Sequence, residues 1–163
     1  GIDLEVIKLA LLGFEGVNRR FSLINNYKGV QIFDDYGHHP IEIKATLSAS
    51  REITKNKVVA IVQPHRYTRL KLLFEDFTSA FNDADIVFIT EIYSAGELNN
   101  FDLTNDSLIN ALISAGHKDV RSYNEIELKS LIDKKLNIGD IVVFLGAGDI
   151  SSKARSFVEK MLT

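Results

Sequence analysis

The chain has 163 residues, of which 45% are hydrophobic and 25% are charged, a composition typical of a single globular domain rather than of a disordered segment. Its net charge of −3 argues against a nucleic-acid-binding module, and its lack of cysteine excludes a disulfide or zinc–thiolate framework. No signal peptide is visible and no apolar run approaches the roughly 20 residues that span a bilayer, so we expect a cytoplasmic protein without nucleic-acid or membrane partners.

The first elements in chain order are a helix and a hairpin. Apolar residues recur at helical spacing over residues 4–12, and Gly13 follows as a stop signal. Residues 20–24 and 30–33 have the pattern of strands, and the turn-forming residues 25–29 between them predict an antiparallel hairpin.

The rest of the chain alternates between helices and continuous apolar runs. The runs are typical of strands covered on both faces, and they lie at 58–62, 86–89 and 141–145. The helices are predicted at 40–54, 68–81, 103–115, 125–136 and 151–162. This alternation predicts an α/β domain: an open, mostly parallel, Rossmann-like sheet with helices on both faces and an antiparallel strand near the N-terminus.

In such sheets ligands bind beyond the carboxyl ends of the strands, and the loop at residues 34–40 is unusual there. It reads Asp-Asp-Tyr-Gly-His-His-Pro, and Pro40 suits the first position of a helix. In one alternative, Asp34 or Asp35 caps a neighbouring element and the histidines are solvated. The density of titratable side chains favours a binding site.

A second unusual loop, residues 63–69, reads Gln-Pro-His-Arg-Tyr-Thr-Arg. Arg66 and Arg69 fall in the first turn of a helix, where the helix dipole disfavours positive charge. A bound carboxylate or phosphate would explain their position. The alternative, that one arginine pairs with Asp34 or Asp35, is compatible with a binding site.

Other strand-end loops carry weaker signals. Residues 91–97 offer two carboxylates, and the glycine-rich residues 146–149 predict a tight turn with a close packing contact rather than a phosphate cradle. Arg19 and Arg20 are interpreted as a solvated strand edge. The sequence has no P-loop, no His-Glu-x-x-His pair and no Gly-x-Ser-x-Gly elbow, so we expect no metal site and no self-sufficient catalytic machinery in it.

Taken together, these motifs resemble the C-terminal domain of the Mur ligases. The resemblance runs from about Leu4 to the end and is carried by residues 16–21, residues 34–43, residues 63–69 and residues 146–150. Ile41 departs from it, since threonine is usual before the glutamate.

The resemblance implies a three-domain, cytoplasmic, ATP-dependent ligase of peptidoglycan synthesis, and hence of cell-wall formation and division. By the same resemblance, the ligase would join L-alanine to UDP-N-acetylmuramate through an acyl-phosphate intermediate. Residues 1–163 would form the amino-acid-binding, lid-like domain, inactive alone, while the UDP-binding and central P-loop domains lie outside this chain. A chain that begins at Gly1 and has only Met161 as methionine fits a start at that domain boundary.

The resemblance also implies roles for individual residues. Asp35 would lie near the ribose or phosphates of ATP, and ATP and Mg²⁺ would be held mainly by the central domain. The residues expected around L-alanine and the transferred phosphate are Tyr36, His38, His65, Arg66 and Arg69. Among them His38, His65 and Arg69 are the expected catalytic residues, and an unprotonated imidazole would assist the alanine amine. Which histidine does so is left open.

Two other functions remain as alternatives. One is a domain of a murein-peptide recycling ligase, although Tyr36 and Gly37 favour the alanine enzyme. The other is a stand-alone anion- or nucleotide-binding module without catalysis.

Overall fold

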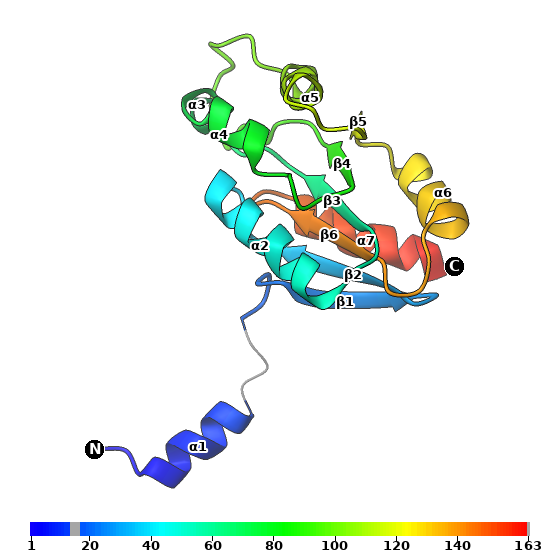
Figure 1. Ribbon diagram of the computed structural model, residues 1–163. Coiled ribbons are helices and arrows are strands. Elements are labelled where there is room, and N and C mark those ends of the chain that lie inside the picture. Colours follow the sequence, from blue (N-terminus) through cyan, green and yellow to red (C-terminus); the bar gives the residue numbers. More distant parts are fainter. Residues whose placement is uncertain (14–16, 163) are drawn as a thin grey trace.

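A single sheet organises the chain in the computed structural model, which describes residues 1–13 and 17–162 (Figure 1). Its strands are β1 (Ser22–Tyr27), β2 (Val30–Asp35), β3 (Val58–Val62), β4 (Ile86–Ile89), β5 (Val120–Ser122) and β6 (Ile141–Leu145). Their order across the sheet is β1-β2-β6-β3-β4-β5, with β1 antiparallel to β2 and every other pair parallel. The predicted fold class is confirmed.

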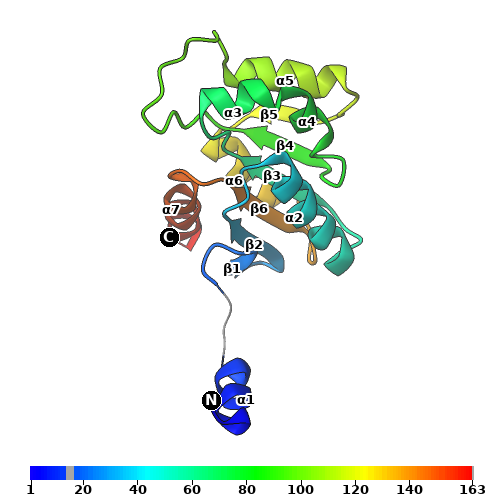
Figure 2. The same ribbon diagram turned by 90° about the vertical axis from the view of Figure 1, so that its left-hand side faces the viewer.

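Helices cover both faces of this sheet. Those that do so are α2 (Pro40–Ile53), α3 (Tyr67–Leu72), α4 (Phe74–Ser79), α5 (Asn105–Ser114), α6 (Glu125–Lys135) and α7 (Ile150–Leu162), while α1 (Leu4–Leu12) precedes the sheet in the chain and does not cover it. One apolar cluster joins α2, α3, α4 and α5 to one face, and a second joins α6 and α7 to the other. Figure 2 shows α2 and α4 on one side of the sheet and α7 on the opposite side.

The continuous apolar runs are buried on both faces, as predicted. Every residue of β3, β4 and β6 is buried, and alternate residues of β3 join opposite clusters: Ala60 lies in the first and Ile61 in the second. A strand with side chains in two cores has no polar face, which explains the unbroken hydrophobic pattern.

One predicted helix is divided in the structure, and one strand was not predicted. The single helix expected at 68–81 is split into α3 and α4, because at Leu73 the backbone leaves the helical region with φ −112° and ψ 21°. The break leaves Leu70 and Phe77 both buried in the core. Strand β5 was not predicted, since it is a three-residue edge strand with only one apolar residue, Val120, and no apolar run.

Strand β2 extends two residues further than predicted. Asp34 and Asp35 were expected in the loop, but they are paired in register with Phe144 and Leu145 of β6. Both acids are buried, at 1% and 6% exposure. They therefore end the strand instead of entering solvent.

Helix α1 stands apart from the sheet in both views (Figures 1 and 2). Asp3 caps it, as its side chain accepts a hydrogen bond from the Glu5 amide, and none of its residues is buried. Among the described residues, no helix has the length and apolar character needed to cross a bilayer. Gly16, which begins one of the motif segments, and Thr163, the last residue of the predicted domain, lie outside the described residues.

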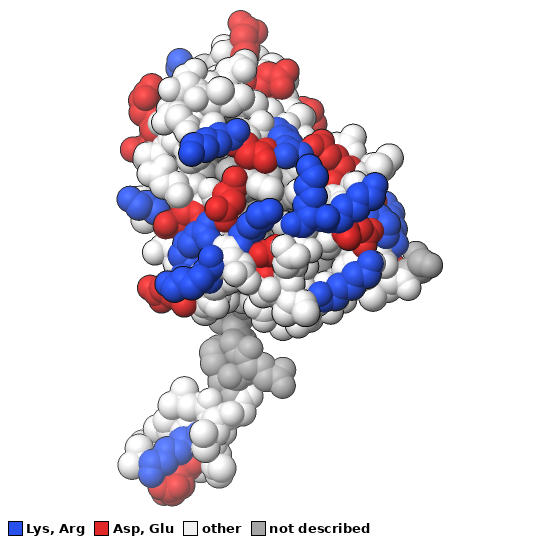
Figure 3. Space-filling model, turned by 45° about the vertical axis from the view of Figure 1, so that its right-hand side comes forward, with Lys and Arg blue, Asp and Glu red and all other residues white. Residues whose placement is uncertain are grey.

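The surface carries interspersed charges. On the face shown in Figure 3, lysine and arginine side chains lie beside aspartate and glutamate side chains and do not form a separate basic patch. Ion pairs such as Arg121–Asp119 and Lys28–Asp133 occur across the domain.

The carboxyl ends of β2, β6 and β3 meet at one edge of the sheet. The amide of Gly146, after β6, donates to the carbonyl of Asp35, and the amide of Gln63, after β3, donates to the carbonyl of Leu145. These bonds continue the sheet past its strands and set the following loops side by side. The unusual loops of the sequence therefore meet at this edge.

Candidate functional site

A row of aromatic rings connects the loops at the carboxyl edge of the sheet. The ring centroids are 5.3 Å apart between Tyr36 and His38, 5.5 Å between His38 and His65, and 5.3 Å between His65 and Tyr93. These four residues, called the aromatic row below, come from the loops after β2, β3 and β4. The structure thus brings together His38 and His65, which are 27 residues apart in the chain.

The N-terminus of α2 gives the first loop its shape. The carboxylate of Glu42 accepts hydrogen bonds from the amides of His38 (3.0 Å) and His39 (3.1 Å), while the His39 side chain caps the helix at Ile41. Burial raises the pKa of Glu42, but these two hydrogen bonds, together with the nearby His38 and Arg20, hold that pKa below its ordinary value. His39 is therefore a helix cap, whereas His38 is directed into the aromatic row.

Asp35 holds the same loop from inside. Its Oδ1 accepts from the Gly37 amide (2.7 Å) and the Thr46 hydroxyl (3.2 Å), and its Oδ2 accepts from the Phe21 amide (2.7 Å). With 6% exposure, this carboxylate makes the structural contacts that the capping alternative predicted.

Hydrogen bonds determine which nitrogen of His38 carries the proton. Nδ1 lies 2.9 Å from the carbonyl oxygen of Tyr36 and 3.5 Å from Oε2 of Glu42. Both oxygens only accept, so we assign the proton to Nδ1. In the neutral ring Nε2 then keeps its lone pair as a proton acceptor.

His65 has the opposite arrangement. Nη1 of Arg69 lies 3.1 Å from His65 Nδ1 and 3.2 Å from the His65 carbonyl oxygen, and a guanidinium can only donate. Nδ1 of His65 is therefore an acceptor, and the ring proton lies on Nε2. Burial lowers the pKa of His65, and the nearby His38 and Arg69 lower it further, so the ring is neutral at pH 7.

The N-terminus of α3 is occupied by a carboxylate of the chain itself. Glu97 accepts from the amide (3.0 Å) and the hydroxyl (2.7 Å) of Thr68, and its Oε1 lies 3.7 Å from Nη1 of Arg66. These hydrogen bonds lower the pKa of Glu97. Sequence reasoning predicted an external anion at this position, and the structure places Glu97 there. Arg66 has φ 70° and precedes the helix, while Arg69 is turned toward His65.

Three residues of this region were not predicted as site residues: Tyr93, Glu97 and Arg19. Tyr93 and Glu97 lie in the weaker strand-end loop, where an aromatic and an acid after a buried strand were the available signal. The interpretation of Arg19 as a solvated edge is wrong, because its side chain is 25% exposed and donates to the Gly146 carbonyl. Nothing in the local sequence indicates that contact, which spans 127 residues.

The glycine-rich turn is a packing feature, as predicted. A Cβ on Gly148 would lie 2.4 Å from Oε1 of Gln63 and 2.6 Å from Cγ of Tyr93. Gln63 also donates to Asp149 (2.6 Å) and accepts from the Ile150 amide (3.3 Å). Gln63 and Tyr93 thus fill the space beside Gly148, which is the close packing contact that the sequence predicts here.

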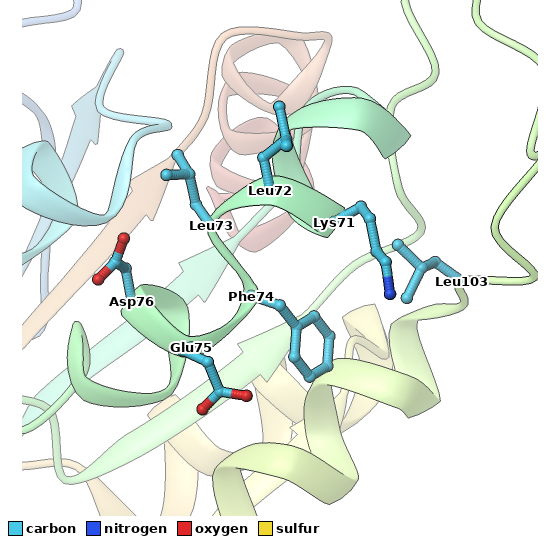
Figure 4. A pocket seen from close by; sticks show the side chains of 7 residues that line it. All are labelled: Lys71, Leu72, Leu73, Phe74, Glu75, Asp76 and Leu103. Atoms are coloured by element: carbon cyan, nitrogen blue, oxygen red, sulfur yellow. The ribbon is translucent and has the colours of Figure 1, made fainter.

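Elsewhere in the described chain we find a pocket but no second cluster of histidine and arginine side chains like that of the aromatic row. No group of three or more His, Asp or Glu side chains gathers in a metal-binding arrangement among the described residues. A pocket of about 290 Å³ lies at the break between α3 and α4 (Figure 4), lined by Lys71, Leu72, Leu73, Phe74, Glu75, Asp76 and Leu103. It contains no histidine or arginine and shares no residue with the aromatic row, so we place the candidate site at the row.

The chain matches a known protein family. Residues 19–148 match the family described as Mur ligase, glutamate ligase domain. The chain is 52% identical over 155 residues to UDP-N-acetylmuramate–L-alanine ligase of Bartonella henselae, covering 94% of the chain and 33% of that protein. It is 48% identical over 162 residues to the ligase of the same name from Roseobacter denitrificans, covering 99% of the chain and 35% of that protein. The chain thus spans about a third of the length of the curated relatives it matches.

Solved structures agree with this match. The crystal structure of UDP-N-acetylmuramate–alanine ligase from Thermotoga maritima superposes with a TM-score of 0.76 at 32% identity, over 99% of this chain and 34% of that chain. A murein peptide ligase from Psychrobacter arcticus superposes with a TM-score of 0.66 over 99% of this chain and 33% of that one, and at 23% identity it shows the fold alone.

Proposed function

This chain belongs to the Mur ligase family, and we propose that residues 1–163 are the C-terminal domain of an ATP-dependent ligase that joins L-alanine to UDP-N-acetylmuramate in peptidoglycan synthesis. The observation that carries the proposal is the meeting of His38, His65 and Arg69 at the carboxyl edge of the sheet. Relatives that are about half identical and bear that enzyme's name support it. The UDP-binding and P-loop domains are proposed to lie outside this chain.

The aromatic row suits a small zwitterion beside a phosphate. Arg69, with Arg66 next to it, supplies positive charge for the alanine carboxylate or the transferred phosphate. His65 adds a neutral donor at Nε2, because its Nδ1 is already engaged by Arg69. Tyr36, which is 39% exposed, lies at the end of the row beside His38.

We assign the amine of L-alanine to His38. Attack by an amine requires loss of a proton from the ammonium, and a histidine can accept that proton only at a ring nitrogen with a free lone pair. Nε2 of His38 is such a nitrogen, since Nδ1 donates to the Tyr36 carbonyl. In His65, Nε2 carries the ring proton. We therefore assign His65 to substrate binding and His38 to accepting the proton of the alanine ammonium.

ATP supplies the phosphoryl group that activates the muramate carboxylate, and we expect ATP and Mg²⁺ to be held mainly outside this chain. The filled glycine-rich turn supports this division of roles. Asp35 is proposed to lie near the nucleotide and to act by fixing the backbone of its loop, because both of its oxygens are engaged within the domain. The isolated chain should therefore be inactive.

Product analysis with two acceptors tests the proposal. The full-length protein is supplied with UDP-N-acetylmuramate, ATP and Mg²⁺, together with L-alanine or the tripeptide L-alanyl-γ-D-glutamyl-meso-diaminopimelate. ADP release and product mass are then measured. We expect ligation of L-alanine and none of the tripeptide. Ligation of the tripeptide alone would indicate the recycling ligase, and no ADP release with either acceptor would indicate a binding module.

A further inference from the structure

Residues 19–21, just before β1, are hydrogen-bonded to the loop that follows β2. Arg19 and Phe21 have φ values of 60° and 46°, in the left-handed region that non-glycine residues seldom adopt. The carbonyl of Arg19 accepts from the Tyr36 amide (2.7 Å), and the amide of Phe21 donates to Oδ2 of Asp35 (2.7 Å). These bonds fix the unusual backbone next to the aromatic row.

The side chain of Arg19 makes two further contacts across the site. Its Nη2 donates to the carbonyl oxygen of Gly146 (2.6 Å), and its Cζ lies 4.8 Å from the centroid of the Tyr36 ring. The guanidinium is thus in cation–π contact with the first member of the aromatic row while bonded to the glycine-rich turn. Gly148 of the same turn packs on Tyr93, the last member of the row.

A buried acid explains why a cation is required at this position. Asp34 is 1% exposed, and its Oδ2 accepts from the Ser151 hydroxyl and lies 3.8 Å from Nε of Arg19. Oδ1 of Asp34 and Nε of Arg19 are both buried and have no hydrogen-bond partner among the residues that the structure describes. A buried carboxylate needs a nearby opposite charge, and Arg19 is the cation closest to it among the described contacts.

We propose that Arg19 is a positioning residue of the candidate site. It neutralises Asp34, sets the Tyr36 ring against His38 and holds the glycine-rich turn against Tyr93. Both ends of the aromatic row therefore depend on the Arg19 guanidinium. The effect on catalysis rests on the proposed function, whereas the placement of the Tyr36 ring does not.

The 163-residue chain provides the first test, by NMR of ¹³C-labelled tyrosine rings. In Arg19→Met the Tyr36 ring resonances, assigned with Tyr36→Phe, should move more than those of Tyr27, which lies at the other end of the hairpin. Arg19→Lys keeps the charge beside Asp34 but lacks the planar fork, so the Tyr36 resonances should move with little loss of stability. Unmoved Tyr36 resonances in the folded variants would overturn the proposal.

Arg51 provides a matched control. It bonds the carbonyls of Asp83 (2.8 Å) and Asn56 (2.6 Å) and pairs with Asp85, so it also joins several loops, but at the amino edge of the sheet. Arg51→Met should lower the melting temperature and leave the Tyr36 resonances in place. An equal shift of Tyr36 in Arg51→Met would show general loosening and contradict a specific role for Arg19.

Kinetics of the full-length protein provide the second test. Below the melting temperature of each variant, Arg19→Met should raise KM for L-alanine by about fivefold or more, the effect expected when one cation–π contact and one charge-assisted hydrogen bond are lost. Arg51→Met should leave that KM within about twofold of the wild-type value. An unchanged KM and kcat in Arg19→Met would reduce Arg19 to a purely structural residue. If the wild-type protein shows no alanine-dependent turnover, the proposed function fails, and the NMR result still decides the placement of Tyr36.

Discussion

Replacing Gly148 with alanine tests whether the glycine-rich turn supports the aromatic row. The new Cβ would lie 2.4 Å from Oε1 of Gln63, 2.6 Å from Cγ of Tyr93 and 2.7 Å from Cδ2 of the same ring. Gly148 is not in the left-handed region, so the cost arises from crowding and not from backbone strain. Inserting one methyl group into a packed site costs about 1–3 kcal/mol. Tyr93 must shift, and its stacking on His65, with ring planes 17° apart, must change.

Thermal unfolding and NMR measure these two consequences. For a domain of this size, each kcal/mol lowers the melting temperature by about 2–4 °C, so a loss of roughly 2–12 °C is expected. The His65 ring resonances should also move. Gly116→Ala is the control, because it combines φ 101° with open space and should cost about 1 kcal/mol without moving His65. Wild-type stability and unmoved His65 resonances in Gly148→Ala would refute the reasoning.

Three other variants test the site and the fold. In the full-length protein, Arg69→Ala should lower turnover at least about tenfold, the loss expected for a charge-assisted contact, while Lys71→Ala serves as the control; equal rates for both would remove Arg69 from the site. NMR titration of the chain should give a His65 pKa below the ordinary value of 6.5, and Arg69→Gln should raise it. With a lowered pKa in the folded state, His65 binds a proton more readily in the unfolded chain. Neutral His65 therefore stabilises the folded state above about pH 6.5, and this stabilisation is lost as the pH falls through the pKa of folded His65. A measured pKa at or above 6.5 in the folded chain would contradict this. Asn124→Ala removes the cap at the Glu127 amide and should lower the free energy of unfolding by about 1 kcal/mol in urea, and an unchanged value would show that the cap is not needed.

Burial patterns explain why the sheet was predictable from sequence. Residues 58–62 and 141–145 are apolar at every position because helices cover both faces of their strands. Edge strand β5 has no such pattern, since Val120 and Arg121 are only partly buried. The break at Leu73 has no glycine or proline beside it in the sequence to indicate it.

The candidate site could be predicted only where its residues are close in sequence. The loops holding His38 and His65 were found because polar residues follow buried strands. Two contacts of the region join residues far apart in the chain: Arg19 bonds Gly146, and Glu97 caps the helix at Thr68. The local sequence does not indicate either contact. Tautomers are likewise set by contacts, such as Arg69 on His65, and become assignable only from coordinates.

Separate Michaelis constants test most directly whether the two loops hold the incoming amino acid. In the full-length protein, KM for L-alanine, KM for ATP and kcat are measured for His38→Gln and for His39→Asn, which keeps a good helix cap beside it. His38→Gln should lower kcat by about a hundredfold, as expected for loss of a general base, with KM for ATP unchanged and with His39→Asn near wild type. An altered KM for ATP together with unchanged alanine kinetics in His38→Gln would contradict the assignment of this site to the amino acid.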